Sequence, residues 1–484
     1  MIPQERIAEL EAENAALRAQ VGELGALREQ VALLSEQVRT LQSRLAKDSH
    51  NSGKPPSSDG LARKTRSLRR QSGKRAGGQL GHRGETLHLV APAEVDAVVE
   101  HRPAVCEGCR RPLGAEAPVV GRERRQVLDL PPVRLRVTEH QALHLQCPAC
   151  QAVNVGAFPT DAPSRTQYGA HLRALAVYLV EQQLVPYNRV RELFADLFGA
   201  HLSLGTLVTW VRQGAAAPAP VEERIKAALG QAPVLHSDET GVRQAGHLAW
   251  AHVACTDRLT HYAVQAKRGH AATEAIGILP TYRGVNVHDG WAAYRANAGC
   301  RHALCNIHHL RELTFLEEQY EQTWAHDLKH LLRQMKAATD RARHHGDVRL
   351  PPPERDAFVA RYEALLVAGL AANPPPARGP RRRGRIKQSP ARNLLERLWL
   401  GRDHVLAFLD DLRIPFDNNQ AERDLRMLKV QQKISGGFRA ADGSGADAFA
   451  RIRGYLSTLR KQGVALLAAL ETVFAGHPLY PAFV

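Results

Sequence analysis

The stretch PVLHSDETGVRQAGHLAWAHVACTDRLTHYAVQ (residues 233–265) decides the fold of this chain. It holds three strand-like runs in succession, which are Val234–Ser237, Leu248–Cys255 and Thr260–Val264. The short gap between the second and third runs predicts a hairpin. Asp238 follows the first run directly, so we expect this carboxylate at the end of a strand.

The sequence downstream adds a helix and two further strands. The helix is expected at about 271–279, and alternation predicts a fourth strand over Val285–His288, which Asp289 ends. A short fifth strand is expected at His302–Cys305. Three strands, a helix and another strand is the opening order of an RNase H-like domain. Two acidic residues end neighbouring strands in that architecture, and a third comes from a later helix, so we predict such a core to begin over 232–305.

Asp238 and Asp289 are the side chains expected to carry chemistry. Carboxylate oxygens are hard ligands that suit Mg²⁺ or Mn²⁺. Two such ions, roughly 3.5–4 Å apart, can activate an attacking oxygen and stabilise a leaving one at phosphorus. A single strand-end aspartate is ordinarily a turn former or a cap. Two of them in this strand order, in a basic chain with paired cysteines, favour a metal-dependent phosphodiester site.

The third acid has two candidates in the helix expected over Asn418–Val430. Glu422 and Asp424 flank the apolar stripe of this helix on opposite sides, so periodicity does not choose between them. Glu422 also precedes Arg426 by four residues, which would suit a surface ion pair on the helix.

Other polar residues near these acids each have two interpretations. His236 and His288 precede the aspartates on their strands, and we expect both to point to the opposite face as packed core histidines. His308 and His309 could line the site or a DNA groove. Trp291 is expected in the core beneath the site, with stacking on a flipped base as the alternative.

Charge and hydropathy limit the function classes. The chain has 65 Lys and Arg against 49 Asp and Glu, a net charge of +16. This excess suits a polyanion, with nucleic acid as the first candidate and an anionic membrane as the second. No apolar run approaches the roughly 18 residues of a spanning helix, and the start carries charges instead of a signal peptide. We therefore expect a cytoplasmic protein with reduced cysteines and no membrane partner.

The N-terminal segment, residues 5–47, has apolar residues spaced alternately by three and four, which predicts a coiled coil. Asn14 occupies a core position, and the step from Leu24 to Leu27 interrupts the repeat. We expect this helix to form a homodimer or a higher oligomer. The alternative is a single amphipathic helix that packs on its own domain.

Residues 48–86 are poor in apolar residues, and there is no acidic residue between Asp59 and Glu85. Such a segment is expected to be disordered when free, either as a solvated linker or as a basic arm that follows DNA phosphates. The arm would use Arg63, Lys64, Arg66, Arg69, Arg70, Lys74 and Arg75.

Two cysteine pairs, Cys106-Glu-Gly-Cys109 and Cys147-Pro-Ala-Cys150, lie in the next segment. The two-residue gap lets both thiolates of a pair reach one metal ion, and strand-like runs at Val127–Val137 and Ala142–Leu145 lie between the pairs. Residues 100–155 thus predict a zinc ribbon with four sulfur ligands and a structural zinc ion. Four unrelated buried thiols are the alternative.

Residues 166–228 are expected to be helical. One helix, Asn188–Phe198, should stop at Gly199, and the next should begin at a Ser203 cap. This short turn resembles a helix-turn-helix, which would place Arg212 on DNA, although helical hairpins are also common in other proteins. Helices are again expected over 306–416, interrupted by a Pro/Arg-rich break, and over 417–484.

The chain resembles the transposases of the insertion sequence 66 family over essentially its whole length. The motifs that carry the resemblance are the two cysteine pairs together with Asn51-Ser-Gly-Lys-Pro-Pro-Ser-Ser-Asp59, Gly77-Gly-Gln-Leu-Gly-His82, Ser237-Asp-Glu-Thr240, His288-Asp-Gly-Trp291, Cys305-Asn306, Asp417-Asn-Asn-Gln-Ala-Glu-Arg423 and Phe449-Ala-Arg-Ile-Arg453.

The resemblance implies an acid triad of two Asp and one Glu on an RNase H-like core, with a helical insertion before the Glu. It is the resemblance that selects Glu422 over Asp424. It also implies a bacterial, nucleoid-associated enzyme that cleaves mobile-element ends and joins them to target DNA, with accessory proteins encoded by the same element. Arg423 and Arg426 would either contact DNA phosphates or neutralise the acids.

Three other functions fit part of this pattern. A metal nuclease with the same core would lack strand transfer, and a transposase-derived regulator would bind DNA without cutting it. A structural coiled-coil zinc protein would leave Asp238 and Asp289 unexplained.

Overall fold

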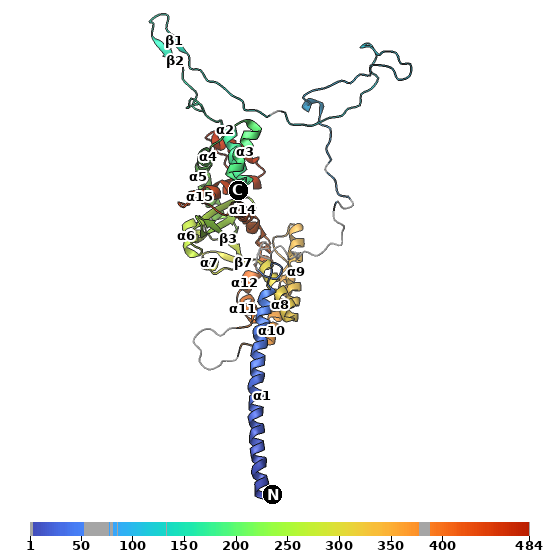
Figure 1. Ribbon diagram of the computed structural model, residues 1–484, viewed down its shortest axis with the longest axis vertical. Coiled ribbons are helices and arrows are strands. Elements are labelled where there is room, and N and C mark those ends of the chain that lie inside the picture. The colour runs from blue at the N-terminus through green and yellow to red at the C-terminus, as the bar shows by residue number, and fades with distance from the viewer. Residues whose placement is uncertain are drawn as a thin grey trace.

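The computed structural model describes residues 3–52, 77, 81–84, 86–131, 133–376 and 388–483. It shows a mixed α/β body, with the long helix α1 (Pro3–Leu45) leading to one end and β1 and β2 at the other (Figure 1). The seven Lys and Arg residues of the predicted basic arm, from Arg63 to Arg75, lie outside the described residues.

A five-stranded mixed sheet, in the order β5–β4–β3–β6–β7, forms the centre of the body. Its antiparallel half is β3 (Val234–Gln244), β4 (His247–Cys255) and β5 (Thr260–Gln265). In its other half β6 (Val285–His288) runs parallel to β3, and β7 (Arg301–Leu304) runs parallel to β6. All five predicted strands are therefore confirmed.

The first strand is longer than predicted. β3 does not end at Asp238 but continues to Gln244, and Asp238 is paired with Val253 of β4. The strand ends at a two-residue turn in which Ala245 and Gly246 have φ angles of 48° and 82°. Positive φ at both central residues gives the turn whose twist matches a hairpin, so β3 and β4 stay paired up to it. The expected strand end at Asp238 was wrong for this reason.

The alternation of β3 divides its side chains between two differently covered faces. Asp238 and Val242 lie on the face that packs against α14 (Asn419–Ser435) and α15 (Ser444–Lys461). α15 approaches this face closely at Gly454, where an added Cβ would lie 3.2 Å from a backbone oxygen of β5. Glu239 lies on the other face, toward α7 (Ala292–Arg295), and α6 (His270–Ile276) and η4 (Leu279–Thr281) also cover that side.

The helices before the sheet share one core with the last helices of the chain. Gly199 ends α3 at a φ of 63°, and the Ser203 hydroxyl accepts the Thr206 N–H at 3.0 Å at the start of α4, so both predicted helix boundaries are confirmed. The helices of this core, besides α15, are α2 (Ala170–Val177), the π-helical turn η3 (Tyr178–Gln182), α3 (Tyr187–Phe198), α4 (Leu204–Ala216), α5 (Ala219–Gln231) and α16 (Leu466–Phe474).

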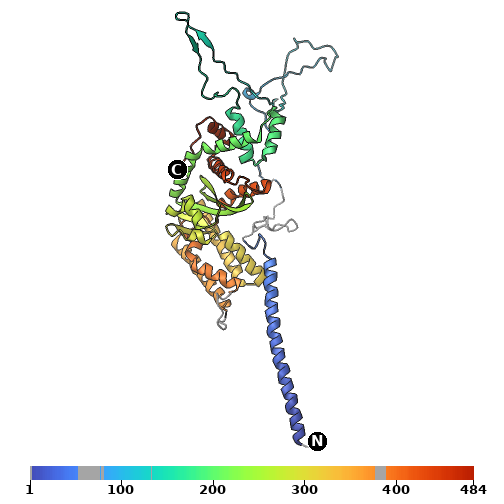
Figure 2. The same ribbon diagram turned by 60° about the vertical axis from the view of Figure 1, so that its left-hand side comes forward.

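The helices predicted for the insertion between β7 and α14 are confirmed, and they pack around a core that includes Val285 and Val287 of β6 and Ala303 and Leu304 of β7. Figure 2 shows these helices as a bundle beside the sheet. They are α8 (Asn306–Tyr320), α9 (Thr323–His344), α10 (Pro352–Ala372), α11 (Pro390–Leu400), α12 (Arg402–Val405) and α13 (Ala407–Asp410).

The N-terminal helix exposes the apolar seam predicted for a coiled coil. Val21 is 67% exposed and Val31 is 60% exposed. At the C-terminal end of α1 the Tyr320 hydroxyl of the insertion donates to Ser43 at 3.2 Å, and just beyond the helix the Lys47 ammonium lies over the Phe315 ring. None of the helices in the described part of the chain combines the length and apolar character needed to cross a membrane.

The cysteine-containing segment has little regular structure. It contains the short helix η2 (Pro92–Glu94) and a hairpin of β1 (His144–Gln146) and β2 (Val153–Val155). The strand predicted over Val127–Val137 was wrong, because the described residues of that range form no strand. Their apolar side chains remain in solvent, with Val127 93% exposed. An alternating pattern forms a strand only where one face finds a core to cover it.

Candidate active site

Three carboxylates lie near one another on the α14 side of the sheet, and among the described residues their oxygens are not all within 4.8 Å of one another. Asp238 lies half-buried within β3, and Asp289 is exposed directly after β6. The parallel register pairs His236 with Val287, and two more residues along both strands bring Asp289 beside Asp238. Glu422 lies in the first turn of α14, which packs against β3.

Neighbouring carboxylates and burial raise the affinity of Asp238 for protons. Burial, together with the negative charges of Glu239, Asp289 and Glu422, raises the pKa of Asp238 to about 8. Within the described ranges, no Lys, Arg or His forms an ion pair with Asp238, Asp289 or Glu422. Mg²⁺ or Mn²⁺ binds hard oxygen ligands and would neutralise their unbalanced negative charge, so these residues fit such an ion.

Asn418 fixes the start of α14 against the sheet. Its side-chain amide donates to the Ser237 carbonyl at 2.9 Å, and its Oδ1 lies 2.9 Å from His236 Nδ1. Its backbone N–H points to the Cys305 sulfur at 3.2 Å. These three contacts set the position of Glu422 four residues later, and no local feature of the sequence identified Asn418 for this role.

The expectation for His236 was wrong, and the expectation for His288 is confirmed. His236 precedes Asp238 by two residues, so both side chains lie on the same face of β3. His288 directly precedes Asp289 and is fully buried on the opposite face, 3.1 Å from a ring nitrogen of His302. Of the other histidine pair, His309 is buried and bonded to Asn306.

Asp424 belongs to a different set of contacts. Its carboxylate accepts from the Lys461 ammonium at 2.7 Å, and its backbone oxygen accepts from the Tyr262 hydroxyl at 2.7 Å. Both side chains of the ion pair are about nine-tenths buried. Asp424 therefore joins α14 to α15 and β5, away from the three acids.

A second network, on the opposite face of β3, supports both aspartates. Glu239 follows Asp238, and its buried carboxylate accepts from the Arg268 guanidinium and the Tyr294 hydroxyl. The guanidinium lies between two indole rings, 4.7 Å from Trp250 and 4.1 Å from Trp291. The backbone N–H of Trp291 in turn donates to the Asp289 carboxylate at 2.9 Å. Sequence reasoning missed Glu239 and Arg268, whose contact spans 29 residues.

We expect Arg268→Ala to lower the free energy of unfolding by about 2–3 kcal/mol, because it leaves a buried carboxylate without its cation. The Glu239 side chain is 1% exposed, whereas Arg268 is 36% exposed and its loss is partly compensated by water. Arg268→Lys should fall between, since an ammonium stacks less well on indole rings. Urea denaturation measures the change, with Arg243→Ala on the exposed side of β3 as the control. Equal losses in the two alanine variants would contradict this role.

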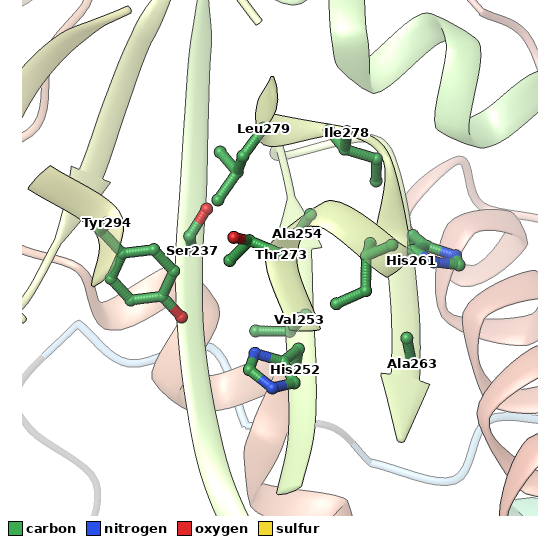
Figure 3. A pocket seen from close by; sticks show the side chains of 11 residues that line it. Ser237, His252, Val253, Ala254, His261, Ala263, Thr273, Ile278, Leu279 and Tyr294 are labelled. Carbon is green, nitrogen blue, oxygen red and sulfur yellow. The ribbon is translucent and has the colours of Figure 1, made fainter. Parts of the chain in front are cut away.

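The same face of the sheet contains a small, mostly apolar cavity (Figure 3). The polar residues that line it are Ser237, His252, His261, Thr273 and Tyr294. Because Ser237 and Asp238 are successive residues of one strand, the cavity and the three acids lie on opposite faces. The cavity is therefore separate from the candidate active site.

The four predicted zinc ligands form two turns of the same shape. Cys106 N–H donates to the Arg111 carbonyl at 2.9 Å, and Cys147 N–H donates to the Ala152 carbonyl at 2.8 Å. The residue after the second cysteine of each pair has a φ near 60°. Backbone N–H groups of Cys109 and Gly108 lower the pKa of the Cys106 thiol, and those of Cys150 and Ala149 do the same for Cys147. Each turn thus favours the thiolate form of its first cysteine, the form that binds metal.

The structure does not bring the two turns together. Of the described residues, no three of these four cysteines have sulfur atoms within 4.8 Å of one another. In small metal domains the bound ion supplies much of the folding energy, and the surrounding side chains here bury almost no apolar surface. The two preformed halves fit a zinc ion with four thiolate ligands.

Three of the arginines predicted to contact DNA lie within the described residues, and all three are exposed. Arg212 lies on α4, and Arg423 and Arg426 lie on α14, close in sequence to Glu422. Arg423 donates to the Gln420 side chain at 2.7 Å. Neither arginine of α14 forms an ion pair with a described carboxylate, so both are free to meet phosphates.

Three family models match parts of this chain. A family model described as the transposase IS66 family matches residues 165–446, more than half of the chain. A model for the zinc-finger binding domain of transposase IS66 matches residues 103–151, and a family of unknown function matches residues 2–88. The uncharacterized protein y4jD of Sinorhizobium fredii (strain NBRC 101917 / NGR234) is 28% identical over 221 residues. The match spans 42% of this chain and 42% of that protein.

Proposed function

Because this chain belongs to the IS66 transposase family, we propose that it is a DDE-type DNA transposase. It would cleave the ends of a mobile element and join the freed 3′-hydroxyl to target DNA. The observation that carries this proposal is the proximity of Asp238, Asp289 and Glu422, from three separate elements, on one face of the sheet.

The sheet topology supports an RNase H-like core. Three antiparallel strands come first, two parallel strands are added beside the first of them, and the helix carrying the third acid follows. The insertion of α8 to α13 separates the strands from that helix, so the acid is distant in sequence but close in space.

The three carboxylates would hold Mg²⁺ or Mn²⁺, which when bound neutralises charge on the attacking and leaving oxygens of a phosphodiester. The chain positions these ligands before DNA binds. β3 and β6 fix the aspartates side by side, and Asn418 fixes the first turn of α14. The Glu239 network supports both aspartates from the opposite face of the sheet, so the carboxylates need little rearrangement as the reaction proceeds.

DNA would be bound largely through its phosphates. The net charge of +16, the predicted basic arm and the exposed Arg212, Arg423 and Arg426 all favour such contacts. α3 and α4 would act as the helix-turn-helix, and the zinc-bound cysteine segment would add a further DNA-binding surface.

Protomers would pair through α1, whose exposed apolar seam needs a partner. A homodimer or higher oligomer would hold two element ends together. The expected partner of this apolar seam is the α1 helix of a second copy of this chain. Accessory proteins of the same element would join the complex.

The proposal predicts a pH-dependent stability for chains without Mg²⁺ or Mn²⁺. The pKa of Asp238 is about 8 in the folded chain, which is higher than in the unfolded chain. Between these two pKa values the unfolded chain loses the proton more readily, so the free energy of unfolding falls as the pH rises. We expect Asp238→Asn to raise the melting temperature, and the gain to grow from about pH 5 to about pH 8. Added Mn²⁺ should stabilise the natural chain at the upper pH and not the variant. A gain independent of pH would contradict this account.

A joining assay separates the proposed function from a nuclease. Element ends that are already cleaved expose their 3′-hydroxyl groups, so joining to target DNA requires no prior hydrolysis. We expect joined products with Mg²⁺ or Mn²⁺. Cleavage of intact ends without any joining would favour a metal nuclease, and binding without cleavage or joining would favour a DNA-binding regulator.

A further inference from the structure

Glu422 also belongs to a second cluster, of a different chemical type. The Cys305 sulfur, a His308 ring nitrogen and a Glu422 carboxylate oxygen all lie within 4.8 Å of one another. Cys305 precedes α8, and His308 lies in the first turn of that helix. The cysteine and histidine are separated by two residues, a spacing that lets both reach one metal ion.

Two side chains of this cluster, His308 and Glu422, lack hydrogen-bond partners among the described residues. His308 Nδ1 is buried and makes no hydrogen bond to any described residue. The Glu422 carboxylate likewise has no hydrogen bond or ion pair in the described part of the chain. Buried polar atoms in folded proteins are nearly always bonded, so an unpaired ring nitrogen points to a missing ligand.

The backbone around the cluster is held in place. Cys305 N–H donates to the His288 carbonyl at 2.9 Å, and Asn306 N–H donates to the Phe416 carbonyl at 3.0 Å. The Asn418 N–H that points to the Cys305 sulfur connects the start of α14 to the same junction. Burial and the negative charge of Glu422 raise the pKa of the Cys305 thiol to about 12, and this N–H lowers it only in part, so an incoming ion must displace the thiol proton.

We propose that Cys305, His308 and Glu422 form a binding site for Zn²⁺ or a similar borderline-soft divalent ion. Sulfur and imidazole nitrogen are zinc ligands, whereas Mg²⁺ selects oxygen almost exclusively. Binding replaces the thiol proton of Cys305, which is released to solvent. Glu422 cannot fully serve both sites, so zinc would compete with Mg²⁺ or Mn²⁺ and inhibit cleavage. The inhibition rests on the proposed function, but the binding does not.

The binding is tested with Co²⁺, which replaces zinc and gives a charge-transfer absorption band when a thiolate binds it. The probe is Co²⁺ added to the full chain after it has been loaded with zinc and dialysed. The dialysis is carried on until the site with one thiolate has lost its zinc, whereas zinc held by four thiolates is retained and keeps the two cysteine turns from contributing. We expect one additional band in the natural chain and in Cys300→Ser, a matched buried cysteine outside the cluster.

The band should be absent in Cys305→Ser, and His308→Gln should need at least about tenfold more Co²⁺ to produce it. His308 is half-buried, so its variant tests the site even if the buried Cys305 variant unfolds. An equal band in all four chains, or none in the natural chain, would overturn the proposal.

Zinc inhibition separates this proposal from the proposed function. With Mn²⁺ present, low concentrations of zinc should slow cleavage by the natural chain and by Cys300→Ser, and His308→Gln should require about tenfold more zinc. A Co²⁺ band without cleavage under any metal condition would refute the proposed function and leave the site standing. Mn²⁺-dependent cleavage without the Co²⁺ band would refute the zinc site and leave the proposed function standing.

Discussion

An Asp289→Asn variant is expected to bind element-end DNA as tightly as the natural chain and to cleave it about 10³-fold more slowly or worse. Metal ions contribute several kcal/mol to phosphodiester chemistry, and each 1.4 kcal/mol is about tenfold in rate. An amide is a poor ligand for Mg²⁺ or Mn²⁺. Asp289 is exposed and forms no ion pair with a described residue, so the substitution should not disturb the fold.

Gel-shift binding and strand cleavage with Mg²⁺ or Mn²⁺ measure the two effects separately. Asp257→Asn, an exposed aspartate in the β4–β5 turn of the same sheet, is the control and should cleave normally. Normal cleavage by Asp289→Asn would remove this residue from the site. A loss of both binding and thermal stability would show a structural role instead.

The second large effect separates Glu422 from Asp424. Glu422→Gln should abolish cleavage and leave thermal stability unchanged or slightly higher, since it removes repulsion from a cluster of acids. Asp424→Asn should keep cleavage but lower the free energy of unfolding by about 3 kcal/mol, because it leaves the buried Lys461 ammonium without its partner.

Cleavage rates and urea denaturation are measured for both variants. We expect Glu422→Gln to lose cleavage but not stability, and Asp424→Asn to lose stability but not cleavage. An Asp424→Asn chain that folds stably but does not cleave would transfer the third acid to Asp424. A Glu422→Gln chain that cleaves normally would exclude Glu422 from the triad.

The sequence alone could not choose between these two acids for a physical reason. Both flank the same apolar stripe, and helical periodicity is the same for either. What distinguishes them is Lys461, which is 37 residues away and occupies Asp424. Only the packing of α15 against α14 and β5 creates that contact.

The elements themselves could be predicted where a local signal marks them. Gly199 and Ser203 mark helix boundaries through backbone freedom and capping, and both predictions hold. The end of β3 could not be found this way, because the turn requires a positive φ at Ala245, and alanine rarely adopts a positive φ. His236 was misplaced by an incorrect count of strand alternation, although the information was present in the sequence.

The Glu239 network and the Cys305 cluster show a further limit of sequence analysis. Each joins residues from separate elements, and no spacing rule connects Glu239 to Arg268 or Cys305 to Glu422. The strand prediction at Val127–Val137 was wrong for the opposite reason. The apolar residues alternate regularly, but no other element packs against them. Local pattern specifies elements, whereas tertiary contacts specify sites.

The most direct test of the triad is anomalous X-ray diffraction from crystals of the full chain soaked with Mn²⁺. We expect a manganese peak bound by carboxylate oxygens of Asp238, Asp289 and Glu422, and the loss of that peak in Asp289→Asn crystals. Manganese bound elsewhere in the described body, or bound at the aspartates with the Glu422 carboxylate turned away and Asp424 in its place, would contradict the account.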